Sequence, residues 1–125
     1  MNVTDRARTA SGHSAAPIRT PRPTESTVLA QVSHRLRNAA QRRDVDYPAF
    51  VAALHDNNNL WSTLAVDVAQ PDNELPQDLR ARIFWLAEFT QAETRKLLRG
   101  KGDVGIMIEV NAAVLQGLRG TEVAA

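Results

Sequence analysis

Apolar residues recur at every third or fourth position along most of this 125-residue chain, which is the spacing of amphipathic helices. Breaks that contain proline or glycine divide the pattern into four segments, which predict helices over residues 24–43, 46–70, 76–99 and 103–120. No segment alternates apolar and polar residues over the length of a strand. Because short connections favour antiparallel neighbours, the pattern predicts an all-α fold, a compact bundle of about four antiparallel helices.

Residues with capping chemistry stand at the predicted helix ends. Thr24, Asp46 and Asp103 stand at the start of predicted helices. Their side-chain oxygens can accept a hydrogen bond from a backbone N–H of the first helical turn. Gly100 and Gly120 follow the last periodic positions of the third and fourth segments, where glycine commonly ends a helix. We therefore expect the fourth helix to end at Gly120.

The N-terminal segment differs in composition from the helical segments. Residues 1–23 are mainly Ser, Thr, Ala, Arg and Pro, and such a segment cannot bury enough apolar surface to offset the entropy lost on ordering. The expected organisation is a disordered basic arm at 1–23, one helical domain at 24–120 and a short tail at 121–125.

The third predicted helix carries more apolar surface than one core-facing stripe requires. Beside a stripe that runs from Leu79 to Leu97, a second row follows at helical spacing: Arg82, Trp85, Phe89 and Ala92. A helix that is apolar on two sides is either central in its fold or covered by another molecule. We interpret Trp85, Phe89 and Arg82 as candidates for binding a partner protein, and completion of the core is the alternative role of the two aromatic residues.

The second predicted helix contains the pair Leu60-Trp61 within its apolar stripe. Both residues are candidates for partner contact, and the alternative is that Trp61 completes the core. Asn57 stands one turn before Trp61, and Asn111 interrupts the apolar row of the fourth helix. Because a buried asparagine needs hydrogen-bond partners, we expect Asn57 and Asn111 to bridge these two helices and fix their register.

The residue types that catalysis or metal binding requires are not grouped along the chain. There is no cysteine, His13, His34 and His55 lie in separate segments, and the acidic residues around 67–78 lack the spacing of a calcium loop. We therefore predict no catalytic, cofactor-binding or metal-binding residue, no small-molecule substrate and no enzymatic activity. The sequence has neither an export signal nor a run of about 18 apolar residues, so we expect a cytoplasmic location and no membrane partner.

Charge is distributed unevenly along the sequence. Residues 1–43 carry eight arginines against two acidic residues, whereas residues 44–125 carry seven basic and twelve acidic residues. A basic region can meet an anionic partner, either RNA or an acidic protein surface, through Arg35, Arg37, Arg42 and Arg43. The region has no interleaved aromatic residue on which bases could stack, which disfavours direct RNA binding.

Five short motifs follow one another along residues 21–120. They are Pro21-Arg22 with Glu25, Asn57 with Leu60-Trp61, Pro71-Asp72-Asn73-x-Leu75-Pro76-x-x-Leu79-Arg80, Ile108-Glu109-Val110-Asn111, and Gly117-Leu118-Arg119-Gly120. By these motifs the chain resembles the FlaF family of flagellar biosynthesis regulators, small helical proteins of alphaproteobacteria. The arm before Pro21 is longer and more arginine-rich than is usual for the family, so nothing carries over to it, and Asn59 stands where the family usually has lysine or arginine. We interpret Asn73, Pro76 and Gly117 as loop, helix-start and packing residues.

The resemblance implies a cytoplasmic, non-enzymatic factor needed for flagellin production and filament assembly. It implies flagellin as the main partner and a role as a chaperone or secretion aid. Because a helical bundle can pack amphipathic helices in a groove, we expect it to cover helices of flagellin that are unpaired before assembly. The resemblance also implies opposition to a FlbT-type translational repressor of flagellin messenger RNA. Two alternatives stay open: an RNA-associated regulator of that messenger, and a scaffold whose main partner is the FlbT-type protein.

Overall fold

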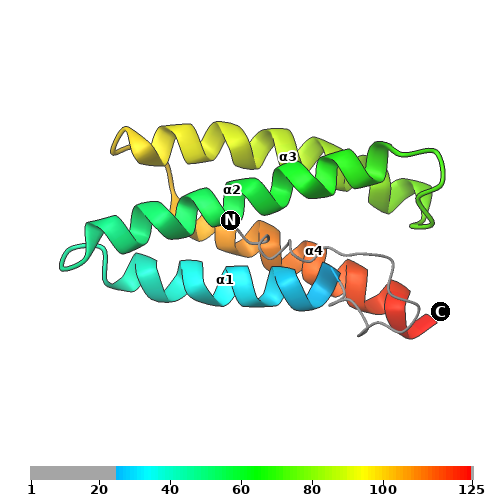
Figure 1. Ribbon diagram of the computed structural model, residues 1–125, viewed down its shortest axis with the longest axis horizontal. Coiled ribbons are helices and arrows are strands. Elements are labelled where there is room, and N and C mark those ends of the chain that lie inside the picture. The colour runs from blue at the N-terminus through cyan, green and yellow to red at the C-terminus, as the bar shows by residue number, and fades with distance from the viewer. Residues whose placement is uncertain (1–24, 125) are drawn as a thin grey trace, which may run out of the picture.

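Four antiparallel helices make up the fold. The computed structural model describes residues 25–124 and contains α1 (Glu25–Gln41), α2 (Tyr47–Ala69), α3 (Gln77–Leu98) and α4 (Val104–Ala124). Successive helices run in opposite directions (Figure 1), which confirms the predicted all-α bundle. The arm predicted at 1–23 and the predicted cap Thr24 lie outside the described residues.

Local capping chemistry explains where the helices begin. The Asp46 carboxylate accepts a hydrogen bond from the Ala49 N–H at 3.2 Å, and Pro48 occupies the first turn of α2, where no intrahelical N–H is needed. At α4, Asp103 Oδ1 accepts from the Gly105 N–H at 2.8 Å. Gly100 adopts φ of 78° directly after α3, a conformation that glycine takes without strain. These three predicted boundaries are confirmed.

The end of α4 differs from the expectation. The helix continues through Gly120 to Ala124, so residues 121–124 of the predicted tail belong to α4. Unlike Gly100, Gly120 does not adopt the left-handed conformation that would end the helix. The last turns are held by tertiary contact, since Ser26 Oγ of α1 donates to Glu122 Oε1 at 2.7 Å.

Gly120 and Gly117 provide a matched pair of helical glycines. A Cβ at position 120 would meet no atom within 4 Å, whereas a Cβ at position 117 would lie 3.2 Å from Leu79 Cδ1 of α3. We expect Gly120→Ala to stabilise the protein by about 0.5–1 kcal/mol through helix propensity, and Gly117→Ala to gain less or to destabilise it. Chemical denaturation of both variants checks this, and equal gains would show that α3 and α4 do not approach closely at Gly117.

The helix pairs differ in how extensively they are in contact. α2 packs against both α1 and α3, α1 also packs against α4, and the pairing of α3 with α4 is the least extensive of the four. Figure 1 shows α3 along one edge of the bundle, lying on α2. α3 therefore has a flank that neighbouring helices cover only in part.

Two apolar clusters form the core and occupy opposite halves of the bundle. Trp61, Ile83 and Leu118 belong to the larger cluster, and Phe50 and Met107 belong to the smaller one. All five side chains are almost completely buried. Burial of a large apolar side chain contributes roughly 1.5–3 kcal/mol, so these clusters supply the main force that holds the helices together.

A polar layer separates the two clusters and takes one buried residue from each helix: Ser33, Asn57, Thr90 and Asn111. Asn111 Nδ2 donates to Asn57 Oδ1 at 2.7 Å and to Ser33 Oγ at 2.9 Å. Trp61 Nε1 donates to Asn111 Oδ1 at 2.8 Å. The predicted bridge between the second and fourth helices is confirmed, and it extends to α1 through Ser33.

Not every polar atom in this layer is satisfied. Asn57 Nδ2 and Thr90 Oγ1 are buried and have no hydrogen-bond partner among the described residues. Such atoms reduce stability, whereas a buried amide pair allows only one alignment of the helices. The layer therefore acts mainly on register.

Candidate functional site

Three aromatic side chains stand out on the surface of α3. Trp85 is 64% exposed and Phe84 48% exposed, and Phe89 is half-buried. The Trp85 and Phe89 rings are stacked, with centroids 6.1 Å apart and planes 7° from parallel. The core-facing side of α3 is formed by other residues, among them the buried Ile83 and Ala87. The aromatic rings are therefore not needed to complete the core. We call Phe84, Trp85 and Phe89 the aromatic face.

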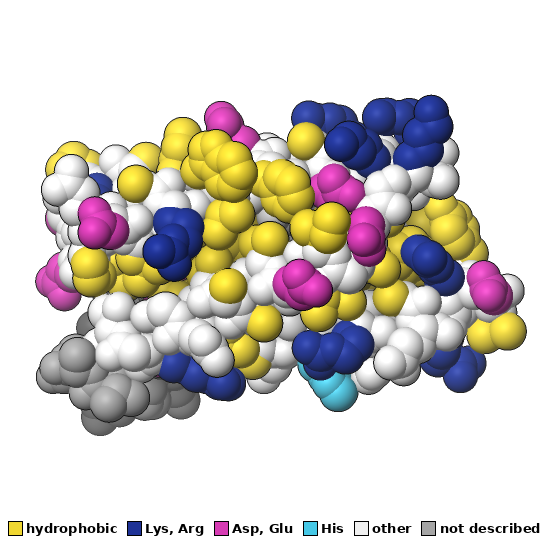
Figure 2. Space-filling model, turned by 180° about the vertical axis from the view of Figure 1, so that it is seen from behind, with side chains coloured by type: hydrophobic (Ala, Val, Ile, Leu, Met, Phe, Trp, Pro, Cys, Tyr) yellow, Lys and Arg dark blue, Asp and Glu magenta, His cyan; other side chains and the backbone are white. Residues whose placement is uncertain are grey.

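The aromatic face is flanked by further apolar surface on the α4 side. Two contacts set the antiparallel register of α3 and α4. Leu79 lies opposite Gly117, and Glu93 Oε2 accepts a hydrogen bond from the Asp103 N–H at 2.7 Å. This register brings Ile106, which is 42% exposed, to the level of Phe89. Figure 2 shows hydrophobic side chains gathered over the upper helix and along its lower border. The exposed apolar surface therefore spans two helices.

On the side of α3 that faces α2, Phe84 and Trp85 line a shallow groove between α2 and the N-terminal half of α3. Val68 and Ala69 form its α2 wall, and Glu88 lies at its rim. The groove is open rather than enclosed, which suits an extended protein surface better than a small molecule. Arg82, which was also predicted to contact a partner, is exposed one turn before Trp85 and two turns before Phe89.

Trp61 and Leu60, which were candidates for partner contact, lie in and against the core. Trp61 is 0% exposed, and its indole N–H is bound to Asn111 in the polar layer. Leu60 is half-buried and packs against the larger core cluster. A partner cannot reach Trp61 while the bundle is folded, so this residue belongs to the core and not to the site.

The motif between the second and third helices has a structural role. Asn73 Nδ2 donates to the Asp67 carbonyl at 3.0 Å, and Asn73 Oδ1 accepts from the Leu75 N–H at 3.0 Å. Arg80 binds the end of α2, since its Nη2 donates to the carbonyls of Val68 and Gln70, each at 2.9 Å. These bonds satisfy carbonyls that a helix end leaves without partners. Asn73 and Arg80 thus fix the turn that places α3 on α2.

The other motif residues also serve packing. Pro76 precedes the first residue of α3, and its carbonyl accepts from the Arg80 N–H at 2.9 Å. Leu79 and Leu118 are buried in the larger cluster, and Gly117 lets Leu79 approach α4. The interpretation of Pro76 and Gly117 as helix-start and packing residues agrees with these contacts.

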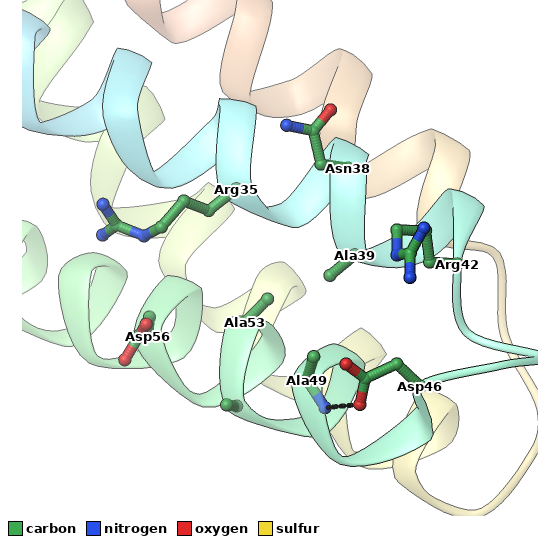
Figure 3. Close-up of a pocket in the computed structure, with 9 residues that line it drawn as sticks. Arg35, Asn38, Ala39, Arg42, Asp46, Ala49, Ala53 and Asp56 are labelled. Atoms are coloured by element: carbon green, nitrogen blue, oxygen red, sulfur yellow. Dashed lines mark hydrogen bonds between the residues drawn. The ribbon is translucent and has the colours of Figure 1, made fainter.

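The arginines proposed for an anionic partner do not converge on one surface. Arg35 and Arg42 line a shallow groove between α1 and α2 with an alanine floor, and Asp46 and Asp56 line the same groove (Figure 3). The Arg43 guanidinium lies 5.3 Å from the centre of the Phe50 ring instead. The carboxylates offset the positive potential of the groove, so it does not offer a continuous path for phosphates.

Neither a metal-binding cluster nor a membrane-spanning helix is found within residues 25–124. In this range no three His, Asp or Glu side chains lie close enough to share a metal ion. None of the four helices combines the length and the apolar character needed to cross a bilayer.

Three residues in these arrangements were not among the sites predicted from the sequence: Ser33, Phe84 and Ile106. Ser33 and Ile106 gave no signal, because neither departs from the ordinary pattern of its helix. Phe84 points away from both predicted rows of α3, and its direction could have indicated the groove between α2 and α3.

Comparison with known proteins gives one match. The model of a family described as "Flagellar protein FlaF" matches residues 7–118. Neither a curated protein nor a solved structure shows significant similarity to the chain.

Proposed function

Because the chain belongs to the FlaF family of flagellar proteins, it has a role in flagellum biogenesis, and we propose that it performs this role by binding flagellin directly. In this proposal it is a non-enzymatic chaperone that supports flagellin synthesis and secretion and acts opposite a FlbT-type translational repressor. The bound segment is an amphipathic helix of flagellin that has not yet been assembled, and the contact surface is the aromatic face.

The observation that carries the proposal is the exposure of Trp85 beside the stacked ring of Phe89. Large aromatic side chains contribute a large apolar contact area and lose little conformational freedom on binding. Phe84 and Ile106 extend the surface on its two sides. An amphipathic helix that packs its apolar face on this surface buries its own apolar side chains together with those of the surface. This is a common way in which proteins recognise helices.

The alternative partner, the FlbT-type protein, is favoured by a separate feature of the bundle. The groove between α1 and α2 presents arginines on one wall and carboxylates on the other. Such a mixed surface suits electrostatic steering toward a folded protein better than it suits a nucleic acid. If this groove is the main contact, the protein is a scaffold and meets flagellin only indirectly.

Calorimetry with purified components tests the proposal. The full chain is titrated with monomeric flagellin, with flagellin that lacks its terminal helices, and with the FlbT-type protein. We expect binding to intact flagellin that is lost when the terminal helices are removed. Binding to the FlbT-type protein alone would support the scaffold, and retained binding to the truncated flagellin would contradict helix capture.

A further inference from the structure

A group of four cations lies at the C-terminal end of α3. Arg95 and Lys96 are in its last turn, Arg99 and Lys101 follow directly, and all four are exposed. Within residues 25–124, only Lys96 has a carboxylate within ion-pair distance, with Nζ 3.9 Å from Glu93 Oε1. The negative pole of a helix corresponds to roughly half a charge, so it offsets only a small part of this group. The end of α3 therefore keeps a net positive charge, visible as the dark blue group in Figure 2.

Two of the cations lie on the same side of α3 as Trp85 and Phe89, further toward its C-terminus. Lys96 follows Phe89 by seven residues and Trp85 by eleven, so all three side chains leave α3 on nearly the same side. At about 1.5 Å per residue, Lys96 lies roughly 10 Å from Phe89 and roughly 16 Å from Trp85 along the helix axis. Arg99 extends the same strip by about one turn. The exposed strip of α3 thus has its aromatic rings in the middle, the single cation Arg82 near its N-terminal end and four cations at its C-terminal end.

We propose that this strip selects an amphipathic helix that carries an acidic cluster two to three turns beyond its apolar residues. The inference rests on the proposed function and deepens it, because it assigns the chemistry by which one helix is preferred over another. Apolar contact with Trp85 and Phe89 supplies affinity, and the basic end sets both the register and the direction of the bound helix. Opposite charges at such a rim act chiefly on specificity and association rate.

Two observations favour an acidic helix over a single-stranded nucleic acid on this strip. The cations are concentrated at one end, where four of them stand against the single Arg82 at the other, whereas a nucleic acid needs cations along the whole path of its backbone. Glu88, which is exposed beside Trp85, would repel a phosphate that passed over the rings. The middle of the strip accordingly suits apolar side chains.

Two synthetic helical peptides of about 20 residues test the proposal, a length at which an alanine-rich helix can form in water. Both carry the same leucines at helical spacing, and one ends in three glutamates and the other in three lysines. We expect the full chain to bind the acidic peptide about tenfold more tightly at low salt. The preference should shrink in about 0.5 M salt, because screening then acts within a few ångströms.

A charge-reversed variant, Lys96→Glu with Arg99→Glu, should invert the preference between the peptides. The matched control is Arg35→Glu with Arg37→Glu, which alters two exposed arginines of α1 and should leave the preference unchanged. Equal affinity for both peptides, inversion by the control, or tighter binding of a single-stranded RNA than of the acidic peptide would each overturn the proposal.

The outcomes separate this inference from the proposed function. If flagellin binds through Trp85 but the charge-reversed variant binds it unchanged, the chaperone proposal stands and the charge recognition is refuted. If flagellin does not bind while the acidic peptide does, the strip has the assigned chemistry and flagellin is not its partner.

Discussion

Replacing Asn111 by alanine should lower the free energy of unfolding by about 3 kcal/mol, because three buried polar groups then lose a partner at once. Trp61 Nε1 loses its acceptor, Asn57 Oδ1 and Ser33 Oγ lose their donor, and all three atoms lie in the interior of the bundle. A loss of this size is a large fraction of the 5–15 kcal/mol that typically separates folded from unfolded domains. Urea denaturation followed by circular dichroism measures it.

Two further variants identify the cause of that loss. Asn59→Ala changes an exposed asparagine of the same helix as Asn57, and it should alter stability by no more than about 0.5 kcal/mol. Trp61→Phe removes the indole donor but keeps most of the apolar volume. Combined with Asn111→Ala, it should show a coupling of about 1 kcal/mol or more, since the two residues share one bond. Strict additivity would mean that the hydrogen bond contributes nothing.

The second large effect is expected on binding and not on stability. Trp85→Ala should weaken the binding of flagellin by about 30-fold or more, which corresponds to roughly 2 kcal/mol, the loss typical of a central aromatic contact. The unfolding free energy should stay nearly unchanged, because the Trp85 side chain is 64% exposed. Calorimetry and circular dichroism on the same preparation measure the two quantities.

Tyr47→Ala is the matched control for this prediction. Tyr47 is also an exposed aromatic residue, but it stands at the start of α2, far from the aromatic face along the bundle. Its replacement should leave flagellin affinity within about twofold of the original. An equal loss in both variants, or unchanged affinity for Trp85→Ala, would remove the aromatic face from the proposed function.

Local chemistry made the helices predictable. Apolar spacing located all four, and the caps Asp46 and Asp103 begin α2 and α4 as expected. The end of α4 was not predictable, because Gly120 is a stop signal only when the chain turns away there. A contact from Ser26, which is 96 residues away in sequence, keeps the last turns helical.

The two tryptophans show the limit of this kind of prediction most clearly. Trp61 and Trp85 both stand in apolar rows at helical spacing, so their sequence surroundings assign them the same alternatives. One is completely buried and the other is largely exposed. The difference arises from the neighbours of each helix: the Trp61 side of α2 is enclosed by the bundle, whereas the Trp85 side of α3 has no helix over it within the described chain.

By itself, then, the sequence determined the number of helices, most of their ends, the asparagine bridge and membership of a flagellar family, since these depend on spacing, capping groups and motifs along the chain. Only the tertiary structure decided which aromatic residues are accessible and that Asn73 and Arg80 hold a turn. The physical reason is that a helical period gives the direction of a side chain relative to its own axis. Burial depends on what stands in that direction, and distant parts of the chain supply it.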